Sequence, residues 1–104
     1  MVARRTKLER CSVRLTVRLF GAAQTSSGLK RVTVQVPSPA TESTLAQCIA
    51  EALPELVGPV VREDLAGLQS SYVFNLNGLI FVRGDAVEIG RSDTLLLFSS
   101  QAGG

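Results

Sequence analysis

Few residues of this chain could do chemistry, and the most unusual of them stand at its end. The sequence closes with Ser99-Ser100-Gln101-Ala102-Gly103-Gly104. Glycine lacks a Cβ, so Gly103 and Gly104 make the end of the chain slim and conformationally free. A slim tip that carries an α-carboxylate is suited to insertion into the active site of another protein. The alternative is a frayed chain end whose glycines have no role.

The other reactive groups do not form a site by their types or spacing. The chain has no histidine and only two cysteines, Cys11 and Cys48, whose separation fits no zinc or redox motif. Without a histidine or a second nearby thiol, a cysteine nucleophile has no base to activate it. Asp85, Glu88 and Asp93 form a local acidic group, and we expect these turn residues to be solvated. We therefore expect no catalytic centre and no metal site in the folded part of the chain.

Length and composition bound the class of protein. A chain of 104 residues with 45% hydrophobic and 19% charged residues is expected to form one globular domain. Residues 1–31 carry eight Lys or Arg and one Glu, whereas residues 32–104 carry three basic and eight acidic residues. Phe20 is the single aromatic residue of this basic stretch, which therefore lacks aromatic interleaving for base stacking, so we expect a solvated, disordered arm over residues 1–11 rather than a nucleic-acid site. Apolar stretches are far shorter than the roughly 20 residues of a membrane helix, so we expect a cytoplasmic protein without membrane contact.

Two strands are predicted after the arm, because apolar and polar residues alternate. Ser12 to Phe20 alternates with period two, and so does Arg31 to Val36. Gly21 to Lys30 contains Gly, Ser and Thr and is predicted to be a loop. The two strands are therefore expected to form a hairpin whose apolar faces share one core.

One main helix is predicted after the second strand. Pro37-Ser38-Pro39 ends that strand, and Thr44 with Gln47 three residues later has the pattern of a capping box. A stripe of apolar residues follows at helical spacing: Leu45, Cys48, Ile49 and Ala52. This stripe is expected to pack the helix onto the sheet and to bury its cysteine. Pro54 ends the helix or opens another turn, and Leu56 to Val61 indicates a second short helical piece.

Three more strands are predicted in the second half of the chain. Tyr72 to Leu76 and Leu79 to Val82 flank Asn77-Gly78, a strong signal for a hairpin turn. The last strand is Thr94 to Ser99. Because Leu95 to Phe98 are apolar without a break, we expect this strand to be buried on both faces. The helix would cover one face, and a partner or further parts of the chain would cover the other.

This order of elements predicts an α+β domain over residues 12–104, with a mixed sheet and one main helix packed across one face. We expect the first and last strands to pair in the middle of the sheet, which is the β-grasp arrangement of ubiquitin. Residues from about 99 to 104 would then leave the sheet as a flexible Gly-Gly tail.

Several short motifs, taken in order, resemble the MoaD type of sulfur carrier, the small subunit of molybdopterin synthase in the MoaD/ThiS group. These motifs are Val17-Arg18-Leu19-Phe20-Gly21, Val34-Gln35-Val36-Pro37, Thr44-Leu45, Leu76-Asn77-Gly78, Asp93 and Ala102-Gly103-Gly104. Two features depart from the family pattern. MoaD chains usually carry prolines where this chain has Ser99-Ser100-Gln101, and a Gly-Asp turn where it has Ser92-Asp93. The serine-rich approach to the glycines is also similar to that of ubiquitin-related modifier proteins, so the recipient of the sulfur stays open.

The resemblance implies a chemistry centred on Gly104. In this family an E1-like, MoeB-like enzyme uses ATP to adenylate the C-terminal carboxylate, and a sulfur donor then displaces AMP to leave a thiocarboxylate. A MoaE-like large subunit of molybdopterin synthase would receive the tail and hold the substrate. The tail would consist of Gln101, Ala102, Gly103 and Gly104, and the partner interface of Phe20, Leu96 and Phe98. The resemblance further implies no stably bound cofactor and no catalysis by this chain alone.

Two other classes of function fit the same residues. One is a carrier for tRNA thiolation or thiazole synthesis, or a modifier that is attached to target proteins through Gly104. The other is a plain binding module of ubiquitin-like fold, whose glycines have no role. The carrier classes require Gly103 and Gly104, whereas the binding module does not.

Overall fold

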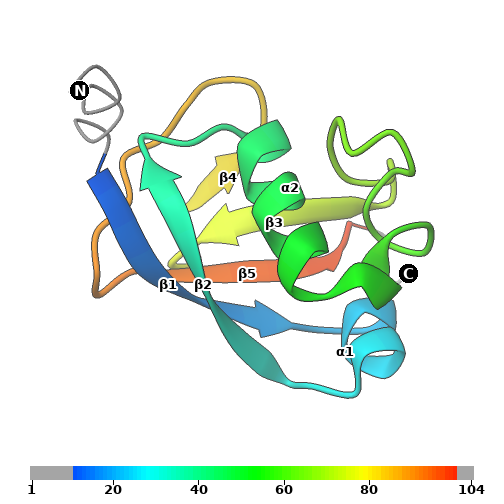
Figure 1. Cartoon of the computed structure of the whole chain (residues 1–104). Coiled ribbons are helices and arrows are strands. Elements are labelled where there is room, and N and C mark those ends of the chain that lie inside the picture. The colour runs from blue at the N-terminus through cyan, green and yellow to red at the C-terminus, as the bar shows by residue number, and fades with distance from the viewer. Residues whose placement is uncertain (1–10, 101–104) are drawn as a thin grey trace, which may run out of the picture.

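The computed structural model describes residues 11–100, which form a five-stranded sheet with one long helix across one face (Figure 1). The strands are β1 (Cys11–Leu19), β2 (Arg31–Ser38), β3 (Tyr72–Leu76), β4 (Ile80–Val82) and β5 (Thr94–Ser99). The helices are α1 (Ala22–Ser27), α2 (Glu42–Ala52) and the short 3₁₀ helix η2 (Pro54–Leu56). The predicted α+β class is confirmed. The predicted arm lies outside the described residues except for Cys11, which opens β1 instead of preceding it.

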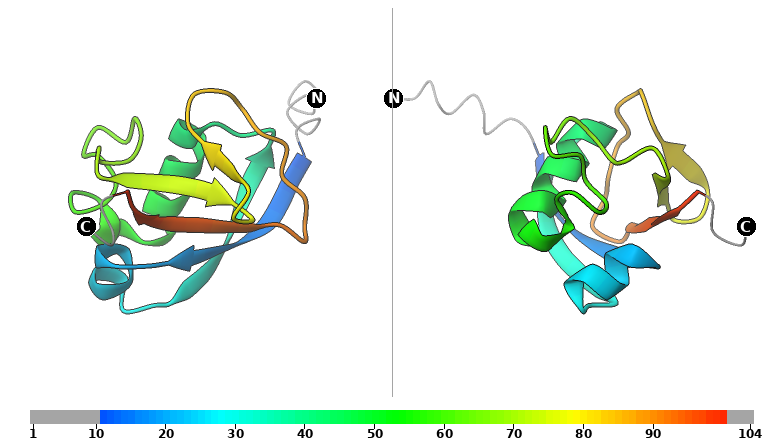
Figure 2. Two further views of the ribbon diagram at one scale, coloured as in Figure 1. Left: turned by 180° about the vertical axis from the view of Figure 1, so that it is seen from behind. Right: turned by 90° about the vertical axis from the view of Figure 1, so that its right-hand side faces the viewer.

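The strand order is β2-β1-β5-β3-β4, so the first and last strands are neighbours in the middle of the sheet, as predicted. β1 and β5 run parallel, whereas the other neighbouring pairs are antiparallel. The left view of Figure 2 shows β1, β5 and β3 in front of α2, which covers the opposite side of the sheet. We call the side turned away from α2 the open face.

The core lies between α2 and the sheet. Its fully buried strand residues include Leu15, Val17, Leu19, Phe74, Leu95 and Leu97. The buried residues of α2 are Leu45, Ala46, Ile49 and Ala50. The predicted stripe is therefore correct for its two large residues but wrong for Ala52, which is exposed, while Cys48 is only partly buried. The helix is turned so that Ala46 and Ala50 face the sheet.

Residues 21–30, predicted to be a loop, contain the short helix α1. Gly21 with φ of 62° and Gly28 with φ of 77° bracket it, and both angles favour glycine. The Gly28 N–H donates to the Gln24 carbonyl at 2.8 Å and closes the last turn. Ala23 is completely buried in the core. Burial of this side chain stabilises a helix that local composition does not favour.

The start of α2 lies earlier than predicted. Thr41 is the N-cap, and its Oγ1 accepts a hydrogen bond of 3.2 Å from the Thr44 N–H. Thr44 is thus the third residue of the helix, where a free N–H needs such an acceptor. Gln47 donates to Ser43 Oγ and to the Leu65 carbonyl, not to the cap.

The structure also corrects the bounds of the second helical piece and of β4, and it contradicts the expected burial of β5 on both faces. The helix expected from Leu56 to Val61 is limited to η2, and Val60 and Val61 are buried in a non-helical turn. Leu79 belongs to the Asn77-Gly78 turn rather than to β4. β5 is not buried on both faces, because its residues alternate between complete and partial burial.

None of the helices within residues 11–100 is long and apolar enough to cross a bilayer.

Candidate docking face

The structure describes the residues predicted for the partner interface but not those of the predicted tail. Gln101, Ala102, Gly103 and Gly104 lie outside the described residues. The point from which they continue is held by Ser100, whose N–H donates to the Ser71 carbonyl at 2.7 Å. The Ser100 hydroxyl donates to the same carbonyl at 3.1 Å. The chain therefore leaves the sheet from a defined position beside the start of β3.

Phe20, Leu96 and Phe98, the predicted interface residues, are brought together on the open face. Leu96 and Phe98 alternate along β5 with Leu95 and Leu97, which are fully buried in the core. Phe20 follows β1, and its N–H donates to the Leu97 carbonyl at 3.1 Å, so it lies beside β5. All three predicted residues are half-buried. The apolar run Leu95 to Phe98, which was expected to be buried on both faces, therefore leaves Leu96 and Phe98 partly exposed on the open face.

Phe81 belongs to the same surface, although the sequence analysis missed it. In the register of the sheet it lies opposite Asn75, and its ring centroid is 6.5 Å from that of Phe98 at an interplanar angle of 50°. Its side chain is 53% exposed, whereas Val82 beside it is 1% exposed. The run Leu79 to Val82 is apolar without a break, so the sequence offered no alternation that would have marked Phe81 as a surface residue. We call Phe20, Phe81, Leu96 and Phe98 the apolar cluster.

Two arginines flank the apolar cluster. The Arg18 guanidinium lies 5.4 Å from the centroid of the Phe20 ring, and the Arg83 guanidinium lies 5.4 Å from that of Phe81. Each cation–π contact at such an exposed site is worth about 0.5–1 kcal/mol. An aromatic and aliphatic centre with arginines at its rim has the composition of protein–protein interfaces. The surface is therefore suited to binding another protein.

Asn75 is a buried polar residue on this open face. It lies on β3 between Leu96 of β5 and Phe81 of β4, and only 6% of it is exposed. Its Oδ1 has no hydrogen-bond partner among the described residues. An unsatisfied buried oxygen of this kind costs about 1–3 kcal/mol. A valine side chain has a similar size and no polar atom, so it would fill the position without that cost. The asparagine therefore interrupts the apolar cluster at the expense of stability.

The surroundings of the Cys48 thiol and of the acidic group Asp85, Glu88 and Asp93 do not indicate a reactive site. Burial, helped by the nearby Glu51 carboxylate, raises the pKa of the Cys48 thiol, which makes it a poor nucleophile at neutral pH. Asp93 accepts one hydrogen bond from the Gly90 N–H within its turn and one from the Asn77 side chain in the β3–β4 turn, whereas Asp85 and Glu88 are exposed. Across the part of the chain that the structure describes, His, Cys, Asp and Glu residues do not gather into a group that could hold a metal ion.

Comparison with known proteins identifies the fold. No family model and no curated protein matches this chain. The crystal structure of SAMP1 from Haloferax volcanii matches with a TM-score of 0.68 and 27% identity over 88% of this chain and 99% of that one. The chain has the ubiquitin-like β-grasp fold. The strand order and the helix across one face of the sheet belong to that β-grasp.

Two further solved structures share the β-grasp. A second crystal structure of small archaeal modifier protein 1 from H. volcanii has a TM-score of 0.65 and 24% identity, over 84% of this chain and 97% of that one. The solution structure of the HVO 2177 protein from Haloferax volcanii has a TM-score of 0.64 and 20% identity, over 89% of this chain and 88% of that one. At these identities the two structures support the fold alone.

Proposed function

We propose that this chain is a ubiquitin-like sulfur carrier whose C-terminal glycine, Gly104, is activated by an E1-like enzyme and converted to a thiocarboxylate. The observation that supports this proposal most strongly is that β5 carries part of the apolar cluster and leads directly to the residue from which the tail continues. Leu96 and Phe98 lie on that strand, and Ser100 is bonded directly after it. From Ser100, four further residues reach at most about 14 Å. A partner that covers the cluster would therefore lie within reach of the Gly104 carboxylate.

The proposed reaction explains why a carrier of this kind needs no acid–base group of its own. A carboxylate is a poor electrophile, so the activating enzyme joins it to the α-phosphate of ATP and releases pyrophosphate. A sulfide equivalent then attacks the acyl carbon and expels AMP, which leaves the thiocarboxylate at Gly104. Sulfur in that group is a good nucleophile for the recipient. Gly103 keeps the approach narrow because it has no side chain to meet the walls of a channel.

For the recipient, we propose a MoaE-like large subunit, with which this chain would form molybdopterin synthase. The large subunit would hold the substrate and supply the remaining catalytic groups, and this chain would deliver one sulfur atom. The apolar cluster would form the contact, with Phe98 and Phe81 as its anchors, because aromatic residues at the centre of an interface carry much of the binding energy.

A second candidate function is protein modification. The observation in its favour is the match to a protein named small archaeal modifier protein 1, at 27% identity over nearly the whole of that chain. In this function the activated carboxyl of Gly104 would form an amide with a lysine of a target protein. The activation step is common to both functions, so they differ only in what attacks the acyl carbon.

The experiment that tests the proposal is an intact-mass measurement. The full chain and a variant that lacks Gly104 are incubated with a MoeB-like enzyme, ATP and sulfide. We expect the full chain to gain the mass difference of one oxygen replaced by sulfur, and the truncated chain to stay unchanged while keeping the same melting temperature. If the full chain gains no mass with any E1-like enzyme of its own cell, the carrier proposal fails. Adducts on target lysines that depend on Gly104 would select the modifier function.

A further inference from the structure

Two arginines lie opposite one another on neighbouring strands of the open face. In the register of β1 and β2, Arg18 pairs with Arg31, and both are exposed. Residues directly opposite in an antiparallel pair have Cβ atoms about 4.5–5.5 Å apart, and like charges at that distance destabilise the sheet. The pair is thus unfavourable in the isolated domain.

No carboxylate relieves this repulsion within residues 11–100. The ion pair that the structure contains there joins Arg62 to Asp64 at 2.6 Å, in a loop outside the sheet. Arg18 instead lies over the Phe20 ring. The two guanidinium groups of the cross-strand pair therefore remain without a negative partner, although the chain has exposed acidic residues elsewhere.

The same face continues as a basic surface toward the start of β1. Arg14 lies four residues before Arg18, an even spacing along β1, and so points to the same side of the sheet. Together with Ser12, Gln35 and Arg91 it lines a hollow of about 510 Å³. These four residues carry hydrogen-bond donors and no carboxylate. We call Arg14, Arg18, Arg31 and Arg91 the arginine band.

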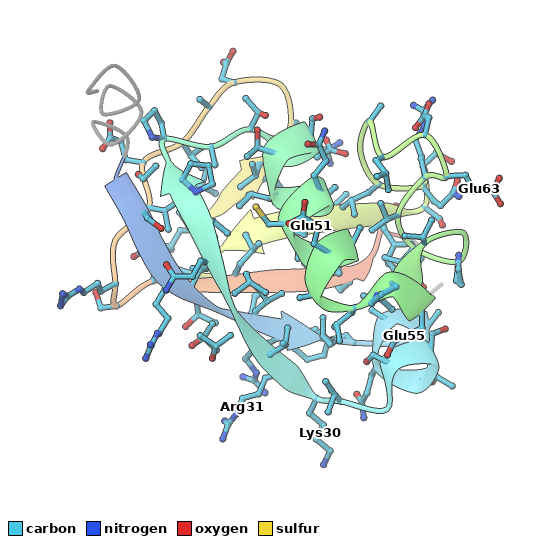
Figure 3. All side chains as sticks on the ribbon, in the orientation of Figure 1. Lys30, Arg31, Glu51, Glu55 and Glu63 are labelled. Carbon is cyan, nitrogen blue, oxygen red and sulfur yellow. The ribbon has the colours of Figure 1, made fainter. Side chains whose placement is uncertain are left out.

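Three exposed glutamates lie away from the start of β2, on another part of the molecule. Figure 3 shows Glu51 and Glu55 on α2 and η2, and Glu63 in the loop beyond them, whereas Lys30 and Arg31 lie at the start of β2. These three glutamates are therefore separated from the arginine band, although the exposed Asp85 and Glu88 lie in the same β4–β5 loop as Arg91. A separated arrangement of this kind attracts and orients a partner of opposite charge.

We propose that the arginine band binds an acidic segment, rich in Asp and Glu, of a partner protein. Carboxylates laid between Arg18 and Arg31 would remove the like-charge repulsion and could accept paired hydrogen bonds from each guanidinium. Arg18 also touches Phe20, so the band adjoins the apolar cluster and one partner can cover both. The inference rests on the proposed function only in taking a protein as the occupant. A nucleic acid is less suited, because Phe20, the aromatic residue that adjoins the band, is half-buried and has a guanidinium over one face of its ring.

The test is an NMR titration of the ¹⁵N-labelled full chain with an oligoglutamate peptide at low salt. We expect shifts of the amides of β1 and β2, which weaken as salt is added. The double variant Arg18→Gln/Arg31→Gln should bind about fivefold more weakly, since two exposed ion pairs are lost. Arg62→Gln is the matched control, because it removes an arginine that already has a carboxylate, and it should bind like the wild type.

Three outcomes would overturn the inference. One is that oligoglutamate leaves the amides of β1 and β2 unmoved. Another is that Arg62→Gln weakens binding as much as one substitution in the band does, which would make net charge the cause. A single-stranded oligothymidylate that binds the band more tightly than oligoglutamate would favour nucleic acid. The chain without Gly104 should bind the peptide normally, so a failure of the carrier chemistry is distinguishable from a failure of the band.

Discussion

The Asn77 side-chain amide donates a hydrogen bond of 2.9 Å to Asp93 Oδ1 and so joins the β3–β4 turn to the turn that precedes β5. The Thr94 N–H donates to Asn77 Oδ1 at 2.8 Å, and the Gly90 N–H donates to Asp93 Oδ2 at 2.8 Å. Asn77 itself has φ of 60°, which asparagine tolerates better than most residues. Two of the motifs that resemble the carrier family thus position the start of the strand that bears Leu96 and Phe98.

Replacement of Asp93 by alanine should lower the free energy of unfolding by about 0.5–1.5 kcal/mol at neutral pH, because its hydrogen bonds are lost at a partly exposed site. The Asn77 amide and the Gly90 N–H hold the pKa of the Asp93 carboxyl below its usual range. The charged form is therefore favoured in the folded state. Its contribution is present above the unfolded pKa of about 3.9 and is lost as the pH falls through the lower folded pKa.

Urea unfolding of the wild type and of Asp93→Ala from neutral to acidic pH checks this prediction. The difference between the two proteins should shrink as the pH falls. Asp85→Ala is the control, because Asp85 is exposed in a turn and should be nearly neutral to replace. A difference that does not depend on pH would show that the charge of Asp93 is not involved.

Replacement of Asn75 by valine should raise the free energy of unfolding by about 1 kcal/mol, because the unpaired Oδ1 is removed and a β-branched residue suits the middle of a sheet. Denaturant midpoints of the two proteins measure the change. Asn77→Val is the contrasting variant and should destabilise, since Asn77 has a positive φ and two side-chain hydrogen bonds. A loss of stability in Asn75→Val would mean that the amide is satisfied in solution.

Replacement of Phe81 by alanine should separate binding from folding. The side chain is 53% exposed and its contacts are with Phe98 and Arg83, so the cost to stability should be about 1 kcal/mol. Affinity for a MoaE-like large subunit should fall by about tenfold or more, if Phe81 anchors that interface. Calorimetric titration measures it, with Leu79→Ala as the control, because Leu79 is an apolar residue that is 81% exposed in the turn. Equal effects of both substitutions would argue against the apolar cluster as the docking surface.

Replacement of Arg31 by glutamine should stabilise the isolated domain by about 0.2–1 kcal/mol at low salt, because it removes a like-charge pair across β1 and β2. The gain should diminish at high salt, where the repulsion is screened. Thermal unfolding at two salt concentrations measures both effects. Arg62→Gln removes a paired arginine and should instead be neutral or slightly destabilising. Destabilisation by Arg31→Gln would show that this arginine has a favourable partner in the isolated domain.

Local pattern was sufficient to predict most elements of this protein. The alternation of Ser12 to Phe20, the Asn77-Gly78 turn and the run Thr94 to Ser99 identified strands that the structure confirms, because strand periodicity and turn angles depend on neighbouring residues. Composition was misleading for α1. That helix depends on the burial of Ala23 in the core, which is a tertiary contact and leaves little trace in ten residues of sequence.

The sequence by itself determined the order of strands and helix along the chain and the apolar faces of the two strands of the hairpin. It also pointed to Phe20 and Phe98 as aromatic residues at the first and last strands. Only the tertiary structure decided which residues of the unbroken run Leu95 to Phe98 face outward, because such a run carries no alternation to read. It also decided that Phe81 meets Phe98 and that Arg18 faces Arg31. Both contacts join strands through their register, which is set by the packing of the whole sheet rather than by any local stretch.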